Sequence, residues 1–253
     1  MVEALRRSVL TLVLLALPAL AGCASTPPLA TAPGLCAFDA PSRTLTVAGR
    51  IDADLAQCML GHGEVEIGVM RVDSVGGNVE AALDAAEVLA RWRPHIIVTG
   101  QCSSSCANYW LPLAGRITLE PRAAVILHGS IDQGFVDQAP PDRRAALQAT
   151  AERQAAFAEI HGVPPGWLMT RTRGDYEAGR GSAHLIGAPT GNGPLAGRIK
   201  YLLVEETLMR SCLSGPQIDP FEDTAPQRAR TRLLNRVVIA WQGVALSGSR
   251  ECV

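Results

Sequence analysis

Short apolar runs of strand length alternate with helical patterns through the middle of the chain. Strands that alternate with helices are typical of parallel sheets with right-handed crossovers. The sequence therefore predicts an α/β domain. A strand and a turn are expected over 43–51, and further strands over 65–72, 95–99, 117–119 and 123–127. The expected helices are 78–92, 107–114 and 143–161, and a turn is expected over 100–106. Beyond residue 193, helices over 199–209 and 225–234 and a strand over 237–244 are expected.

Three candidate active residues come just after expected strands: Gly76, Ser104 and His128. Open α/β sheets bind ligands at the carboxyl ends of their strands. Ser104 opens a helical stretch, where free backbone N–H groups favour developing negative charge. A serine hydroxyl needs an adjacent base to become a nucleophile, and His128 is the candidate base. These residues are candidates for an active site.

Each feature alone has a simpler interpretation. The serine run 103–105 also fits a polar helix cap, and His128 also fits a hydrogen-bonded histidine at the end of a strand. The pair Gly76–Gly77 also fits a plain strand-to-helix turn. These features occur in the same order in a known family whose motifs are given next, and this resemblance favours the site, with Ser105 as the rival nucleophile.

Three segments, in order, resemble the proteolytic subunit of Clp protease. Residues 73–78 (Asp-Ser-Val-Gly-Gly-Asn) are similar to its glycine turn, Asn-Ser-Pro-Gly-Gly. Residues 100–107 (Gly-Gln-Cys-Ser-Ser-Ser-Cys-Ala) are similar to Gly-Gln-Ala-Ala-Ser-Met-Gly-Ala, and residues 125–129 (Val-Ile-Leu-His-Gly) to Val-Met-Ile-His-Gln. The resemblance covers about residues 49–190. It implies a ClpP/crotonase-like fold of repeated β-β-α units with a parallel sheet.

The same resemblance implies roles for individual residues. Ser104 is the implied nucleophile and His128 the implied base. Asp175 is the implied third member, because residues 173–176 (Arg-Gly-Asp-Tyr), with Gly187 twelve positions after Asp175, resemble the family's Arg-Asp-Arg-Phe segment and its later glycine. Asp175 alone also fits a surface turn.

An oxyanion hole is implied as well, from the backbone N–H groups of Ser105 and of Gly77 or Gly76, since a tetrahedral intermediate needs donors fixed where its charge appears. The family's small residues on either side of the nucleophile are Cys102 and Cys106 here. A disulfide between these two cysteines is a hypothesis, and we expect it to brace the nucleophile turn.

Two further departures, Asp73 for Asn and Gly129 for Gln, place substrate-binding details in doubt. The segment 140–161 matches the position of the family's oligomer-contacting handle. Its polar composition leaves assembly into a homo-oligomer open.

The N-terminus has the features of an export signal. Arg6 and Arg7 precede an apolar run over 9–20, which is too short to span a bilayer. Residues 20–23 (Leu-Ala-Gly-Cys) resemble the lipobox of bacterial lipoproteins, which implies lipid modification of Cys23. An uncleaved anchor and an ordinary signal peptide are the alternatives.

The expected organisation has four parts: a lipoprotein signal peptide at 1–22, a flexible tether at 23–35, a ClpP/crotonase-like domain at 36–192 and an extension of unknown role at 193–253. The expected location is the cell envelope, lipid-anchored to a membrane and facing the periplasm. Ala24 after the lipid-modified cysteine favours the outer membrane.

Six cysteines remain once Cys23 is assigned to lipid, and an even number in an exported chain suggests disulfides. Free buried thiols are the alternative. The five histidines are scattered and no Cys-x-x-Cys pair occurs, so neither a metal nor a cofactor is expected. Six cysteines allow about fifteen connectivities, and sequence proximity favours Cys36–Cys58, Cys102–Cys106 and Cys212–Cys252.

Charge is balanced, with 23 Lys and Arg against 24 Asp and Glu, so nucleic acid is not an expected partner. The sequence contains no nucleotide-binding loop of the Gly-Lys-Ser/Thr type. The expected function is that of an ATP-independent serine peptidase acting on peptides or unfolded protein. A crotonase-type acyl-transfer enzyme and a non-catalytic binding or assembly module are the alternatives. Export away from acyl-CoA argues against the first, and intact Ser104 and His128 against the second.

Overall fold

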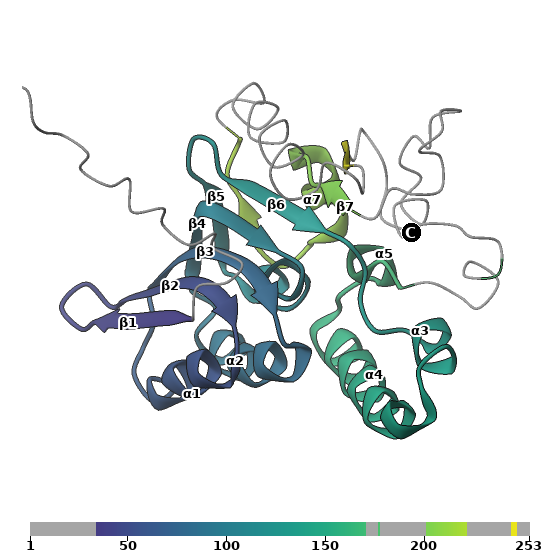
Figure 1. The fold of residues 1–253 in the computed structure, drawn as a ribbon. Helices are drawn as coiled ribbons and strands as arrows, with labels where there is room; N and C mark the ends of the chain where they lie inside the picture. Colours follow the sequence, from purple (N-terminus) through teal and green to yellow (C-terminus); the bar gives the residue numbers. More distant parts are fainter. Residues whose placement is uncertain (1–33, 171–176, 178–200, 222–243, 247–253) are drawn as a thin grey trace, which may run out of the picture.

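The computed structural model describes residues 34–170, 177, 201–221 and 244–246 (Figure 1). The described strands form one sheet, with helices packed around it. The strands are β1 (Leu35–Asp39), β2 (Thr44–Ile51), β3 (Val69–Gly77), β4 (His95–Ser103), β5 (Arg116–Leu119), β6 (Ala124–Leu127), β7 (Tyr201–Leu203), β8 (Gln217–Ile218) and β9 (Val244–Leu246). The helices are α1 (Ala53–Gly61), α2 (Val79–Trp92), η1 (Cys106–Trp110), η2 (Leu111–Leu113), α3 (Gln133–Asp137), α4 (Pro141–His161), α5 (Pro165–Leu168) and α7 (Glu206–Cys212).

The sheet is mostly parallel. Its described strands follow the order β1-β2-β3-β4-β6-β7-β9, with β5 paired to β4 and β8 paired to β5. Strands β2, β3, β4 and β6 are parallel neighbours, whereas β1 and β7 run antiparallel to β2 and β6. The prediction of an α/β domain with a mostly parallel sheet is confirmed. The repeated β-β-α units stay a prediction.

Helix α2 shows how the local sequence sets an element. The side chain of Asn78 accepts a hydrogen bond from the N–H of Ala81 at 3.0 Å and so caps the first turn. The apolar face of α2 is buried in the core, and the helix ends where Arg93 adopts a left-handed conformation. The expected helix over 78–92 is confirmed.

The two central strands differ from their expected bounds. Strand β3 begins at Val69, because Val65 lies in an exposed turn that its N–H closes onto the carbonyl of His62. Both β3 and β4 then continue through the glycines and polar residues expected to form turns, to Gly77 and Ser103. Pairing with neighbouring strands keeps the backbone extended there in spite of its composition.

Other expectations were wrong in detail. The helix expected over 107–114 is a π-helical turn, η1, followed by a 3-10 turn, η2, around Pro112, which has no N–H to continue a helix. The helix expected over 199–209 is instead strand β7 followed by α7. Strands β1 and β8 and helices α1 and α3 were not expected from the sequence.

Strands from beyond residue 193 belong to the same sheet, because β7 pairs with β6, β8 with β5 and β9 with β7. The domain boundaries stay a prediction, and the helix expected over 225–234 lies outside the described residues. Among the helices that the structure describes, none combines the length and the apolar character needed to cross a membrane.

Helices α3, α4 and α5 lie together to one side of the sheet, near the end of β6 (Figure 1). Arg153 joins α4 to α2 through Glu80 and Asp84, each at 2.6 Å. The indole N–H of Trp167, in α5, donates to the carbonyl of Ala107 at 3.0 Å. This helical group is therefore fixed to the elements that follow β3 and β4.

Candidate active site

Ser104 lies in the sharp turn between β4 and η1. Its φ of 55° is left-handed, which is uncommon for a residue with a side chain. Its N–H donates to the carbonyl of Ile126 at 2.9 Å, and its carbonyl accepts from the N–H of Asn108 at 2.8 Å. Both backbone groups are fixed, so the turn presents the hydroxyl at the carboxyl end of the sheet. A strained strand-to-helix turn presents the nucleophilic serine of other hydrolases in this way.

His128 directly follows β6, which runs parallel to β4 beside it. Its Nε2 lies 2.5 Å from Oγ of Ser104, although the two residues are 24 positions apart. Burial lowers the pKa of His128 below the usual 6.5. At neutral pH the imidazole is therefore neutral and able to accept a proton.

The hydroxyls of the two neighbouring serines make other hydrogen bonds. Ser103 Oγ donates to Oε1 of Gln101 at 3.2 Å, and Ser105 Oγ donates to the carbonyl of Gly77 at 3.0 Å. The structure therefore brings Ser104 to His128, and it gives Ser105 a different contact, with the glycine turn.

The glycine turn at the end of β3 packs directly on the serine turn. Gly76 has a φ of 80°, and a Cβ added to it would lie 2.4 Å from the carbonyl oxygen of Ser103 and 2.9 Å from the nitrogen of Ser105. Only glycine fits at position 76, because the two turns are too close together for a side chain there. The N–H of Gly76 donates to Oγ of Ser74 at 3.1 Å. Of the two glycines expected in the oxyanion hole, Gly76 therefore has its N–H engaged within the turn.

The side chain of Asp73, in β3, is hydrogen-bonded to the backbone of β4 shortly before Ser104. Its Oδ1 accepts the N–H of Gln101 at 2.8 Å. A Cβ on Gly100 would lie 2.3 Å from the Asp73 carboxylate, so the missing side chain of Gly100 makes room for it. Sequence reasoning did not assign this role to Asp73, although its departure from the family's Asn was a signal.

Two expected disulfides are present in the structure. Cys102 and Cys106 are joined across the serine turn, with a Cα–Cα distance of 5.3 Å, and both side chains are fully buried. Cys36 and Cys58 join β1 to α1. The third expected pair includes Cys252, which lies outside the described residues.

Two further expected site residues, Asp175 and Cys23, also lie outside the described residues. Their roles as the third catalytic member and the lipidated residue stay predictions.

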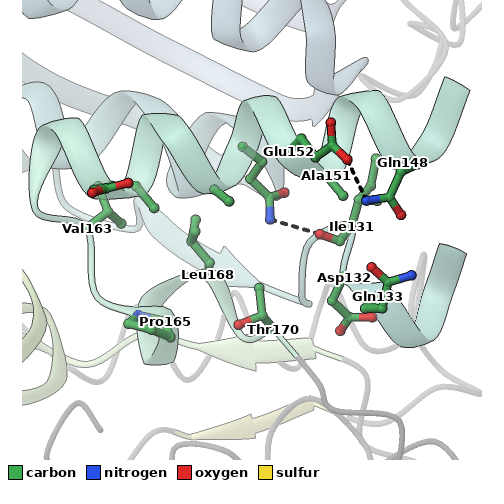
Figure 2. Close-up of a pocket in the computed structure, with 14 residues that line it drawn as sticks. Ile131, Asp132, Gln133, Gln148, Ala151, Glu152, Val163, Pro165, Leu168 and Thr170 are labelled. Atoms are coloured by element: carbon green, nitrogen blue, oxygen red, sulfur yellow. Dashed lines mark hydrogen bonds between the residues drawn. The ribbon is translucent and has the colours of Figure 1, made fainter.

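A cavity of about 550 Å³ lies beside the segment that follows His128 (Figure 2). Helix α4 forms one wall, Ile131 and Asp132 lie at one end, and Val163 and Pro165 lie at the other (Figure 2). A volume of this size is typical of ligand pockets, which span roughly 300–1,000 Å³.

Buried polar side chains connect this segment to η1 and α4. Asn108 Nδ2 donates to Oγ of Ser130 at 2.9 Å, and Ser130 Oγ donates to the carbonyl of Leu168 at 2.7 Å. Tyr109 donates its hydroxyl to Oε1 of Gln154 at 2.6 Å, and burial raises the pKa of Tyr109. Sequence reasoning missed these residues. Only Asn108 had a signal, as a polar residue within the apolar helical stretch over 107–114.

Among the described residues, Cys36, Cys58 and His62 are close enough together to suggest a metal site. The two cysteines are joined in a disulfide, however, so neither offers the thiolate that a metal ion requires. This group does not fit a metal ion.

Comparison with known proteins finds no family model and no curated protein that matches the chain. Among solved structures, the chain is similar to a ClpP1 mutant from Listeria monocytogenes, with a TM-score of 0.36 and 17% sequence identity. The match covers 48% of this chain and 72% of that chain. The chemical interpretation of the site rests on its own geometry.

Proposed function

We propose that this chain is an ATP-independent serine peptidase of the cell envelope that acts on peptides or unfolded protein. The observation that carries the proposal is the hydrogen bond of 2.5 Å between Ser104 Oγ and His128 Nε2. A partly buried histidine whose pKa is lowered stays neutral and can take the serine proton. The left-handed turn at Ser104 supports the same role.

In the proposed reaction, Ser104 Oγ attacks the substrate carbonyl carbon while His128 Nε2 takes the hydroxyl proton. The tetrahedral oxyanion then collapses, and the leaving amine receives that proton from His128, which leaves an acyl ester on Ser104. Water, deprotonated by His128, attacks the ester, and the carboxylic acid departs as Ser104 recovers its proton. Asp175 is the proposed group that orients the imidazole and stabilises its charged form.

The proposed oxyanion donors are the backbone N–H groups of Gly77 and Ser105. Gly77 is preferred to Gly76 because the N–H of Gly76 donates to Ser74. Ser105 lies at the start of η1, and its nitrogen faces the glycine turn at Gly76. The hydrogen bond from the Ser105 hydroxyl to the Gly77 carbonyl supports a fixed distance between the two donors.

The proposed location is supported by the disulfides at Cys36–Cys58 and Cys102–Cys106, which persist in oxidising compartments. The proposed anchor is lipid on Cys23, in the segment Leu-Ala-Gly-Cys. We expect Cys23→Ser to abolish incorporation of labelled palmitate and to release the protein from the membrane fraction. Unchanged incorporation in this variant would contradict the anchor.

A fluorophosphonate probe, which labels activated serines, tests the proposed chemistry. We expect the wild-type protein and Ser105→Ala to be labelled, and Ser104→Ala and His128→Ala to lose labelling. Peptide-library cleavage, read by mass spectrometry, then tests whether the acyl donor is a peptide. A folded wild-type protein that takes no label would contradict the proposal and favour a binding module.

A further inference from the structure

The cavity beside α4 is lined in part by the segment that follows His128. Its wall includes Ile131, only three residues after His128. Three residues span at most about 11 Å of chain, so Ile131 lies within that distance of His128.

The walls of this cavity are fixed before a substrate binds. Gln154 Nε2 donates to the carbonyl of Ile131 at 2.9 Å and so joins α4 to the segment after His128 (Figure 2). Ser130 fixes the opposite wall through the carbonyl of Leu168. Such a preformed pocket selects its occupant by shape and charge.

The lining combines apolar side chains with carboxylates. Ile131, Val163 and Leu168 give it an apolar interior. The charged side chains among its described lining residues are all acidic, and no Lys, Arg or His is among them. These acidic residues are Asp132, Glu152 and Glu159.

Glu152 and Glu159 are not neutralised by Arg153, the basic residue that lies between them on α4. Arg153 pairs with Glu80 and Asp84 on α2. Glu152 accepts a hydrogen bond from the neutral amide of Gln148 at 2.8 Å, and Glu159 forms no ion pair with any of the described residues. The charges that the structure describes at the lining, on Glu152 and Glu159, are therefore negative and have no cation beside them among the described residues.

We infer that this cavity binds the side chain of a Lys or Arg residue on the acyl side of the scissile bond. The inference rests on the proposed peptidase function. A Lys or Arg side chain has an apolar stem and a cationic end, which match the apolar interior and the carboxylates. Norleucine has a similar apolar stem without the charge and is therefore the matched comparison.

Binding to Ser104→Ala tests the inference without turnover. Two fluorophore-labelled peptides, Ala-Ala-Lys-Ala-Ala and Ala-Ala-norleucine-Ala-Ala, are compared by fluorescence anisotropy at low salt. We expect the Lys peptide to bind about tenfold more tightly, which corresponds to a modest partly screened charge interaction. The preference decreases as salt increases. Equal or tighter binding of the norleucine peptide would overturn the inference.

A charge-removing variant sharpens the test. In the Ser104→Ala background, Glu152→Gln with Glu159→Gln is expected to remove most of the Lys preference while binding of the norleucine peptide stays unchanged. Glu64→Gln is the control, because Glu64 is an exposed carboxylate outside the cavity that pairs with Arg91. A Lys preference that survives the double change would overturn the inference. Fluorophosphonate labelling of the wild type is independent of this result, so failure of the peptidase proposal is distinguishable.

Discussion

Cys102 and Cys106 lie two residues before and two residues after Ser104, and a disulfide joins them. The turn at Ser104 is thus closed by a covalent bond as well as by hydrogen bonds to Ile126 and from Asn108. Because both sulfurs are fully buried, the bond belongs to the packed interior of the turn. Its position suggests that it maintains the left-handed conformation of Ser104.

Removal of this disulfide separates activity from stability. We expect Cys102→Ala with Cys106→Ala to slow fluorophosphonate labelling about a hundredfold, since an ångström of misplacement costs roughly that much in rate. The free energy of unfolding is expected to fall by about 2 kcal/mol. This loss is less than for a longer loop, because the disulfide closes a separation of only 4 residues. Labelling rates and thermal unfolding measure the two effects.

The second disulfide provides the matched control. Cys36 and Cys58 are 22 residues apart and join β1 to α1, away from Ser104. We expect Cys36→Ala with Cys58→Ala to lose about 2–4 kcal/mol of stability and to keep its labelling rate below the new Tm. Equal effects of the two double variants on labelling would contradict a specific role for Cys102–Cys106.

The pH dependence of labelling reports on His128. As pH falls through its pKa, the imidazole becomes protonated and can no longer accept the proton of Ser104. Because burial lowers this pKa, we expect the labelling rate to reach half its maximum below pH 6.5. A midpoint above 6.5 would show that burial does not dominate the environment of His128. Rate constants measured in a series of buffers of constant ionic strength decide between these outcomes.

The pairing of Ser104 with His128 could be predicted from the motifs that resemble those of Clp protease and from the positions of both residues after strands. His128 directly follows the apolar strand β6, Ser104 follows β4, and the ends of parallel strands meet at one edge of the sheet. The Asn78 cap and the apolar spacing of α2 are similarly local. These features needed no knowledge of the partner segments.

Features that depend on distant partners could not be predicted. Strands β3 and β4 extend through glycine and serine residues because neighbouring strands pair with them there. The hydrogen bond between Tyr109 and Gln154 joins residues 45 positions apart, and neither helix pattern indicates it. The Arg153 contacts with α2 are equally non-local.

Asp175 is the residue whose role most needs a direct test. A carboxylate that orients His128 also stabilises the charged imidazole, so its loss lowers both the labelling rate and the pKa of His128. We expect Asp175→Ala to slow labelling about 10³–10⁴-fold and to shift the pH midpoint further down. The control is Asp142→Ala, an exposed change in the first turn of α4. A slower rate with an unchanged midpoint would indicate a structural effect only.

An added methyl group disturbs the site most where the glycine turn contacts Ser104. In Gly76→Ala, the new Cβ would meet the Ser103 carbonyl oxygen at 2.4 Å at a φ of 80°. We expect a loss of about 1–3 kcal/mol in stability and loss of fluorophosphonate labelling, because the turn can relieve the clash only by moving Ser104.

Gly61→Ala is the matched control, since a Cβ on Gly61 meets no atom within 4 Å. This substitution lies at the end of helix α1 and is expected to leave stability unchanged or to raise it by up to about 1 kcal/mol. Its labelling rate should equal that of the wild type. Urea unfolding and probe labelling of both variants give the comparison. Full labelling of Gly76→Ala would show that the serine turn does not depend on its approach to the glycine turn.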